Sequence, residues 1–334
     1  MGNLDDVYLP FSEEVLARYL ASPAVKGTAV ETENNGNLLA IRYYARSAAE
    51  YKNFHERRDR TQCSFSEMKG PCQIEKDERI WTAGTLIPIH ESAERISAWS
   101  RVLQRCFGPT PPFRPPTSWE DLVMDPLELL LEVPLPSPAE YRRWLGQHLR
   151  ERNLVQYVID GGSRAFVEES SLDTPVPRLE GFTHADAVLS SRSSGLRVIF
   201  EAKLTADASC DVTFDTMRNQ LCRIIDAMID EGAVDTQHQG LMRNAAKSLF
   251  VLLTPKLFKD NPQARLYGYL MHDYCSNPQT LARDLPHRYR NDWAEISRRI
   301  GWLTWEDCHE ILPDACRWID KAGSSTMLSD RQSQ

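Results

Sequence analysis

Three residues near the middle of the chain have the types and spacing that could bind a metal ion and assist hydrolysis. Asp186 lies in HADAVLSS (184–191), and Glu201 and Lys203 lie in LRVIFEAKL (196–204). Both segments have strand-like composition, and the short RSSG turn between them predicts a β-hairpin. Because side chains alternate faces along a strand, Glu201 and Lys203 share one face. The intervening residues are apolar or small and face the other way, toward a core.

This trio of side chains predicts a divalent-metal site. Two carboxylates on neighbouring strands repel each other, and burying a charge is costly unless it is paired or bound to metal. Mg²⁺ takes one or two carboxylates and keeps several of its waters. Lys203 beside them can orient or help to deprotonate a water, while the metal neutralises charge on a phosphate. We therefore expect Mg²⁺ (or Mn²⁺) as the cofactor.

The elements around the hairpin must position these side chains. A helix is expected over 137–152, with Ser137 as its cap, and the hairpin is followed by a long helix over 212–232 and a buried strand over 248–255. The order is therefore strand, turn, strand, helix, strand. Outside it, the patterns predict helices over 11–21 and 91–108, a strand or short helix over 36–45, no assignable element over 46–80, and mostly helix after 255.

Prolines divide the chain. Nine of the 20 prolines lie between Pro109 and Pro138. Proline fixes φ and has no N–H to donate, so this stretch is expected to be an extended connector. The expected organisation is an N-terminal region of mixed or helical structure and unknown role over 1–108, a connector over 109–136, a second domain with a helical C-terminal extension over 137–325, and a disordered tail over 326–334.

The order of elements, with Asp186 in HADAVL and Glu201-Ala202-Lys203 in IFEAKL, resembles the core of the PD-(D/E)XK nuclease superfamily. The resemblance covers roughly residues 137–256, about a third of the chain. It implies an α/β fold with a mixed central sheet flanked by helices, a restriction-endonuclease-like core. The α-rich N-terminal region and the helical C-terminal extension are additions to that core. Ala185 stands where the family pattern has proline.

The resemblance also implies roles for individual residues. Metal would be held by Asp186, Glu201 and the backbone carbonyl of Ala202, and Glu180 corresponds to an additional acid that some members supply upstream. Gln220, in the helix after the hairpin, matches a polar residue that several families direct into the site. An ordinary boundary residue beside the apolar stripe is the competing interpretation of Gln220. The expected catalytic set is Asp186, Glu201, Lys203 and Gln220.

Charge sets a limit on how nucleic acid can bind. The net charge is −8, so the average field of the surface repels a polyanion. Local arginines can still neutralise several phosphates, and the expected contacts are Arg142 and Arg143 before the hairpin and Arg218 and Arg223 beside Gln220. Solvated helix faces are the competing interpretation of these arginines. Weak intrinsic affinity is expected, with a homodimer or a partner subunit supplying the rest.

Taken together, these features predict a metal-dependent nuclease that cuts DNA, and the resemblance implies a role in restriction or antiphage defence. The alternative is a non-catalytic nuclease-fold scaffold or nucleic-acid-binding subunit of a larger complex. A third interpretation is a general α/β protein whose Glu201 and Lys203 belong to a solvated edge strand. Eight cysteines without a C-x-x-C spacing, no signal peptide and no apolar run of 18 residues predict a cytoplasmic protein with no membrane contact.

Overall fold

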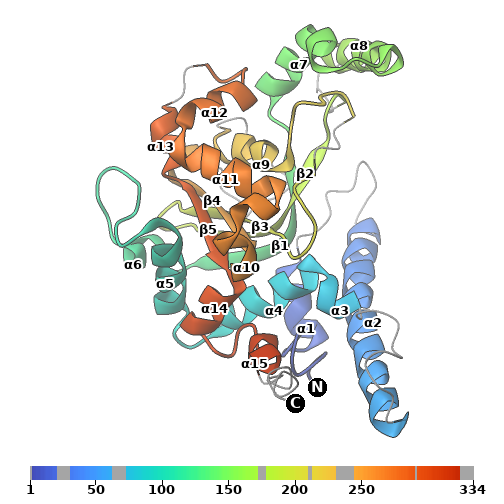
Figure 1. The fold of residues 1–334 in the computed structure, drawn as a ribbon, viewed down its shortest axis with the longest axis vertical. Helices are drawn as coiled ribbons and strands as arrows, with labels where there is room; N and C mark the ends of the chain where they lie inside the picture. The colour runs from blue at the N-terminus through green and yellow to red at the C-terminus, as the bar shows by residue number, and fades with distance from the viewer. Residues whose placement is uncertain are drawn as a thin grey trace, which may run out of the picture.

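The structure, a computed structural model, describes residues 2–20, 31–61, 73–171, 178–209, 213–230, 244–289 and 292–323. The tail expected over 326–334 lies outside these ranges. Among the helices described, none combines the length and apolar character needed to span a bilayer. Figure 1 shows helices gathered on both sides of a central sheet.

The sheet has five strands in the order β1-β2-β3-β4-β5. The first three strands, β1 to β3, pair antiparallel, whereas β3, β4 and β5 pair parallel, so the sheet is mixed. The expected α/β class with a mixed central sheet is confirmed. The strands are β1 (Leu127–Pro136), β2 (Phe182–Ser191), β3 (Arg197–Ala202), β4 (Ser248–Thr254) and β5 (Ile300–Thr304).

Strand β1 corrects the expectation of a connector over 109–136. Its prolines, Pro134 and Pro136, pair with β2 although they have no N–H to donate. They are tolerated because β1 is the edge strand, where one side of the backbone needs no ladder partner. Strand β5 departs from the expectation of mostly helix after 255. Its five residues, IGWLT, follow a helical pattern without a strong turn signal.

One face of the sheet is covered by the N-terminal helices, so the boundary expected at residue 109 does not separate two cores. A single apolar cluster joins Leu16, Leu86 and Trp99 of these helices to Phe200 and Val251 of the sheet. Trp305 near the C-terminus belongs to it as well. The helices of this region are α1 (Glu13–Tyr19), α2 (Glu31–Thr61), α3 (Gln73–Lys76), α4 (Glu78–Glu91), α5 (Arg95–Phe107), α6 (Trp119–Leu122), α14 (Trp305–Ile311) and α15 (Trp318–Gly323).

The opposite face of the sheet carries the second layer of helices (Figure 1). Here Ile199 and Phe250 of the sheet pack with Ile225 of α9 and Met271 of α11. Besides two short 3₁₀ turns at 245–247 and 262–264, the layer comprises α9 (Gln220–Met228), α10 (Lys256–Asp260), α11 (Leu266–Ser276), α12 (Pro278–Asp284) and α13 (Trp293–Ser297).

Helix α9 is shorter than the expected helix over 212–232. It begins at Gln220, where the Asn219 side chain accepts a hydrogen bond from the Cys222 backbone N–H. Residues 213–219 are not helical because their side chains are engaged elsewhere. The Asp215 carboxylate accepts hydrogen bonds from Tyr141 and Arg152, which belong to a different helix.

Helices α7 (Ala139–Arg152) and α8 (Gln156–Ser170) form a hairpin that stands apart from the two layers, at the top of Figure 1. A small apolar cluster around Tyr141 and Leu145 holds the pair together. Ser137 does not cap α7 as expected. Its hydroxyl donates instead to the Glu180 carboxylate, 2.9 Å away.

Candidate active site

Asp186 and Glu201 face each other across the antiparallel pair formed by β2 and β3. The last residues paired in the register are Ala187 and Phe200, so Asp186 and Glu201 occupy the next opposing positions. Opposed residues in an antiparallel pair share a face of the sheet. The backbone ladder ends here because the Asp186 carboxylate accepts the hydrogen bond of the Ala202 N–H at 2.7 Å. The hairpin predicted from the sequence therefore brings the two acids together.

The Glu201 carboxylate is held by two donors. Its Oε1 accepts from Lys203 Nζ at 2.7 Å and from Gln220 Nε2 at 2.5 Å. Only 1% of Glu201 is exposed, and its Oε2 is buried without a hydrogen-bond partner among the residues that the structure describes. One oxygen is thus fixed by two protein donors, whereas the other has no donor among the described residues.

Gln220 reaches Glu201 because of the way the loop after β3 meets α9. Gln220 is the first residue of α9, and its backbone N–H donates to the carbonyl of Ser209 at 2.9 Å. This bond ties the start of the helix to the loop that leaves the site strand. The structure therefore joins all four residues of the expected catalytic set, Asp186, Glu201, Lys203 and Gln220, into one cluster.

Glu78 is a member of the cluster that the sequence did not reveal. It is the first residue of α4, behind the N-cap residue Asp77. Its Oε1 accepts from the Leu204 backbone N–H at 2.9 Å, and its Oε2 lies 3.7 Å from Lys203 Nζ. The only signal is an acidic pair, Asp77-Glu78, before an apolar run, and this pattern is typical of an ordinary helix start.

Glu132 lies on the other side of Asp186, in β1. It has a positive φ of 53°, and its carboxylate accepts a hydrogen bond from Tyr44 of α2 at 2.9 Å. A residue other than glycine rarely adopts this conformation. Because the backbone turns at Glu132, the side chains on either side of it point to opposite faces of the sheet. Leu131 packs against the N-terminal helices, whereas Val133 packs in the layer that contains α9.

Burial makes both strand acids reluctant to ionise, and the charge of Asp186 adds to this effect at Glu201. Burial raises the pKa of Asp186 to about 6. Burial and the nearby Asp186 together raise the pKa of Glu201 to about 8, against the opposing effect of Lys203. Burial would lower the pKa of Lys203, but Glu201, Glu78 and Asp186 outweigh it and hold that pKa above its ordinary value. Lys203 is therefore an ammonium at neutral pH.

Acidic side chains outnumber basic ones in this cluster. Glu78, Asp186 and Glu201 supply three acidic groups against the single cation of Lys203, and Glu201 Oε2 is unpartnered. Within the described ranges, no group of three or more His, Cys, Asp or Glu side chains is placed to hold a metal ion. A metal ion here would have Asp186, Glu201, a backbone carbonyl and waters as its ligands. Mg²⁺ prefers this kind of ligand set, with few carboxylates and several waters.

Glu180 does not join this cluster. Its carboxylate accepts from Ser137, and it lies 2.7 Å from Arg223 Nε and 3.4 Å from Arg218 Nε. Each oxygen lies within ion-pair distance of an arginine, so the structure places Glu180 in an ion-pair network apart from Asp186 and Glu201. The sequence could not distinguish these roles, because the partners are about 40 residues away along the chain.

Most of the arginines expected to contact phosphate form ion pairs with carboxylates of the protein. Arg218 is 1% exposed, pairs with Asp226 at 2.8 Å and stacks on Tyr141. Arg142 is also buried and pairs with Glu169, and Arg223 pairs with Glu180. Carboxylates of the protein therefore hold these three arginines, and their contact with phosphate stays a prediction. Of the four, Arg143 alone is exposed.

Comparison with known proteins adds no identification. No protein-family model, no curated protein and no solved structure matches this chain.

Proposed function

We propose that this protein is a nuclease that hydrolyses phosphodiester bonds with Mg²⁺ or Mn²⁺ and that its substrate is DNA. The observation that carries the proposal is the unpartnered Oε2 of the buried Glu201, opposite Asp186 and beside Lys203. A buried carboxylate oxygen without a donor is costly, and a divalent cation would remove that cost. The same residues are those that resemble the PD-(D/E)XK core.

The protein residues have separable tasks in this proposal. Asp186, Glu201 and the carbonyl of Ala202 would hold the ion, which when bound neutralises charge on the phosphate and lowers the pKa of a water. Gln220 fixes the Glu201 carboxylate by donating to Oε1, and this leaves Oε2 toward the ligand. Lys203 is an ammonium, so it orients groups and donates hydrogen bonds instead of accepting a proton.

The test is cleavage by the purified full chain. Supercoiled plasmid, linear duplex, single-stranded DNA and RNA are incubated with Mg²⁺, Mn²⁺ or EDTA. We expect metal-dependent cleavage of DNA. Asp186→Asn, Glu201→Gln and Lys203→Met should each lower the rate by about 100-fold or more, the order of magnitude for losing a preorganised charge or donor. Glu94→Gln and Lys52→Met change exposed residues and serve as matched controls.

Two outcomes would contradict the proposal. Cleavage that survives all three site substitutions assigns the activity to other residues or to a contaminant. DNA binding without cleavage in either metal, together with no Mg²⁺ heat in calorimetry of the wild type, favours the alternative of a non-catalytic nuclease-fold scaffold. Circular dichroism and thermal melts of each variant exclude misfolding as the cause of a loss.

A further inference from the structure

Two hydrogen-bond donors close to the candidate site have no acceptor among the residues that the structure describes. They are the hydroxyl of Tyr267 and the Nε of Arg265, both buried. Tyr267 is 0% exposed, and the Arg265 guanidinium lies over the Phe258 ring, 4.6 Å from its centroid. Leaving a buried polar group without a partner is costly. Two such donors indicate that an acceptor is supplied from outside the residues that the structure describes.

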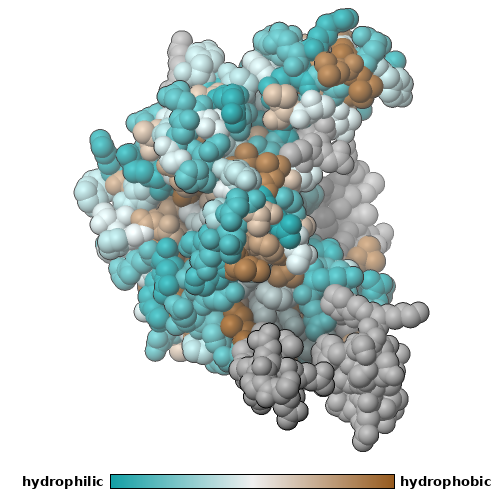
Figure 2. Space-filling model, in the orientation of Figure 1, coloured by the Kyte–Doolittle hydropathy of each residue, from teal (hydrophilic) through white to brown (hydrophobic). Residues whose placement is uncertain are grey.

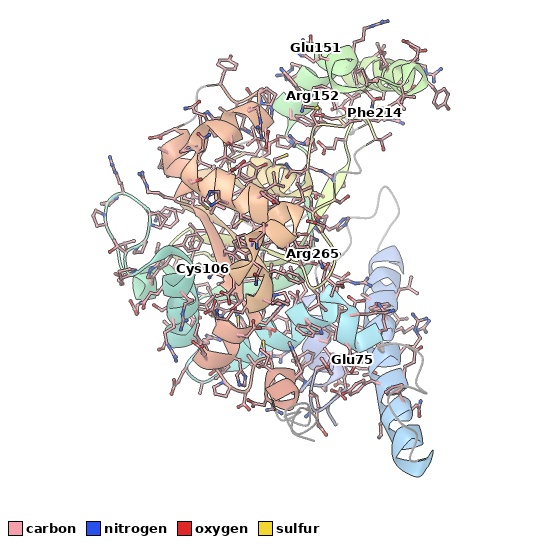
Figure 3. The ribbon with its side chains drawn as sticks, in the orientation of Figure 1. Glu75, Cys106, Glu151, Arg152, Phe214 and Arg265 are labelled. Carbon is pink, nitrogen blue, oxygen red and sulfur yellow. The ribbon has the colours of Figure 1, made fainter. Side chains whose placement is uncertain are left out.

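Asp207 fixes where these donors lie. It follows β3 in the loop that leaves the site, and its carboxylate accepts from the backbone N–H groups of Leu266 at 2.8 Å and Tyr267 at 3.1 Å. The first turn of α11 is therefore tied to the loop after Lys203. Figure 3 shows Arg265 near the middle of the molecule, close to this loop.

Glu78 relates one of the two donors, Tyr267, to the candidate active site. Its carboxylate lies 3.7 Å from Lys203 Nζ, and the same carboxylate also acts on the pKa of Tyr267. Burial raises the pKa of Tyr267 to about 12, although the charge of Arg265 and the contact of its side chain with the hydroxyl oppose the rise. The hydroxyl is therefore protonated at neutral pH and available as a donor.

Asp207, an acid whose charge interacts with that of Arg265, already accepts several backbone hydrogen bonds. Besides Leu266 and Tyr267, the Asp207 carboxylate accepts from the Ala208 N–H at 2.7 Å. Burial would raise the pKa of Asp207, but these backbone donors outweigh it and keep the pKa below its ordinary value. The Asp207 carboxylate is thus engaged by backbone donors, and its charge also interacts with that of Arg265. The Arg265 guanidinium has no ion pair in the part of the chain that the structure describes.

We propose that Arg265 and Tyr267 form an anion subsite that binds a phosphate oxygen of the nucleic-acid backbone next to the metal site. The guanidinium and the hydroxyl are both donors, and adjacent donors of this kind match a phosphate oxygen. The identity of the ligand rests on the proposed nuclease function. The existence of an anion subsite rests on the two unpartnered donors.

Binding is measured separately from cleavage. A fluorescent DNA duplex is titrated with the full chain by anisotropy, with Ca²⁺ replacing Mg²⁺. We expect Arg265→Met to weaken binding by about tenfold, the scale of one charged hydrogen bond. Arg265→Lys should fall between wild type and Met, because it keeps the charge without the planar fork. Arg298→Met, an exposed arginine near the amino end of β5, is the matched control and should bind as wild type.

Tyr267→Phe separates ligand binding from folding. It keeps the ring contacts with Phe258 and Trp302 and removes only the unpartnered hydroxyl. The thermal midpoint should therefore stay the same or rise, while DNA affinity falls about threefold. A structural role of the hydroxyl would instead lower the midpoint. DNA affinity equal to wild type in both Arg265→Met and Tyr267→Phe would overturn the proposal.

Inorganic phosphate and pyrophosphate distinguish this inference from the proposed function. Each is added to the metal-free chain, and the shift of the thermal midpoint is recorded. A shift in wild type that is lost in Arg265→Met supports the subsite even if no nucleic acid is ever cleaved. Cleavage of DNA with unchanged KM in Arg265→Met would support the nuclease and refute the subsite.

Discussion

Glu201→Gln should change the pH dependence of stability in a way that follows from burial. The pKa of Glu201 is raised from 4.5 to about 8, so in metal-free protein the folded state keeps a proton that the unfolded state has lost. Stability therefore falls as pH rises through this window. Above pH 6 Asp186 is largely ionised, because its pKa is about 6, and Glu201 accounts for most of the remaining change.

The size of the effect follows from the same pKa. Integrating proton binding between pH 6 and pH 8 gives a loss of about 2 kcal/mol for wild type. For a chain of this length that corresponds to roughly 3 °C in the thermal midpoint. Glu201→Gln has no proton to lose, so its midpoint should vary less over this range and should exceed that of wild type at pH 8.

The assay is a series of thermal melts in EDTA at pH 6, 7 and 8, followed by ellipticity at 222 nm. Glu94→Gln, an exposed glutamate, is the matched control and should follow wild type. Saturating Mg²⁺ should reduce the wild-type decline, because the ion favours the ionised carboxylate. Equal pH profiles for wild type and Glu201→Gln would refute the view of Glu201 as a costly buried acid.

Two further predictions concern the scaffold. Asp226→Asn removes a fully buried partner of Arg218 and should lower the free energy of unfolding in urea by about 3–5 kcal/mol. Asp260→Asn breaks an exposed pair and should lower it by less than about 1 kcal/mol. Equal losses of stability in the two variants would contradict the burial argument. Gly268→Ala places a Cβ 1.9 Å from a backbone oxygen and should lower the thermal midpoint by several degrees. The Cβ added by Gly161→Ala meets no atom closer than 4.0 Å, so this control should be neutral or stabilising. A thermal midpoint of Gly268→Ala equal to that of wild type would show that the first turn of α11 can shift.

The hairpin and its acids could be predicted because the information is local. Apolar alternation and a short turn fix β2 and β3, and the period of two places Glu201 and Lys203 on one face. The register of the hairpin alone then places Asp186 opposite Glu201. The start of α9 was not predictable in the same way. Residues 213–219 continue an apolar pattern, yet contacts with α7 through Asp215 keep them from becoming helical.

The rest depended on groups that are far apart in sequence. The contact between Glu78 and Leu204 joins residues 126 positions apart, and the ion pairs that occupy Glu180 join separate elements. The prolines of β1 are compatible with a strand only because β1 lies at the edge of the sheet, and this position is set by the tertiary structure. The sequence by itself determined which acids and which lysine share a strand face. Only the packing of two helix layers on the sheet decided which other charges meet them, because burial and long-range pairing depend on the whole fold.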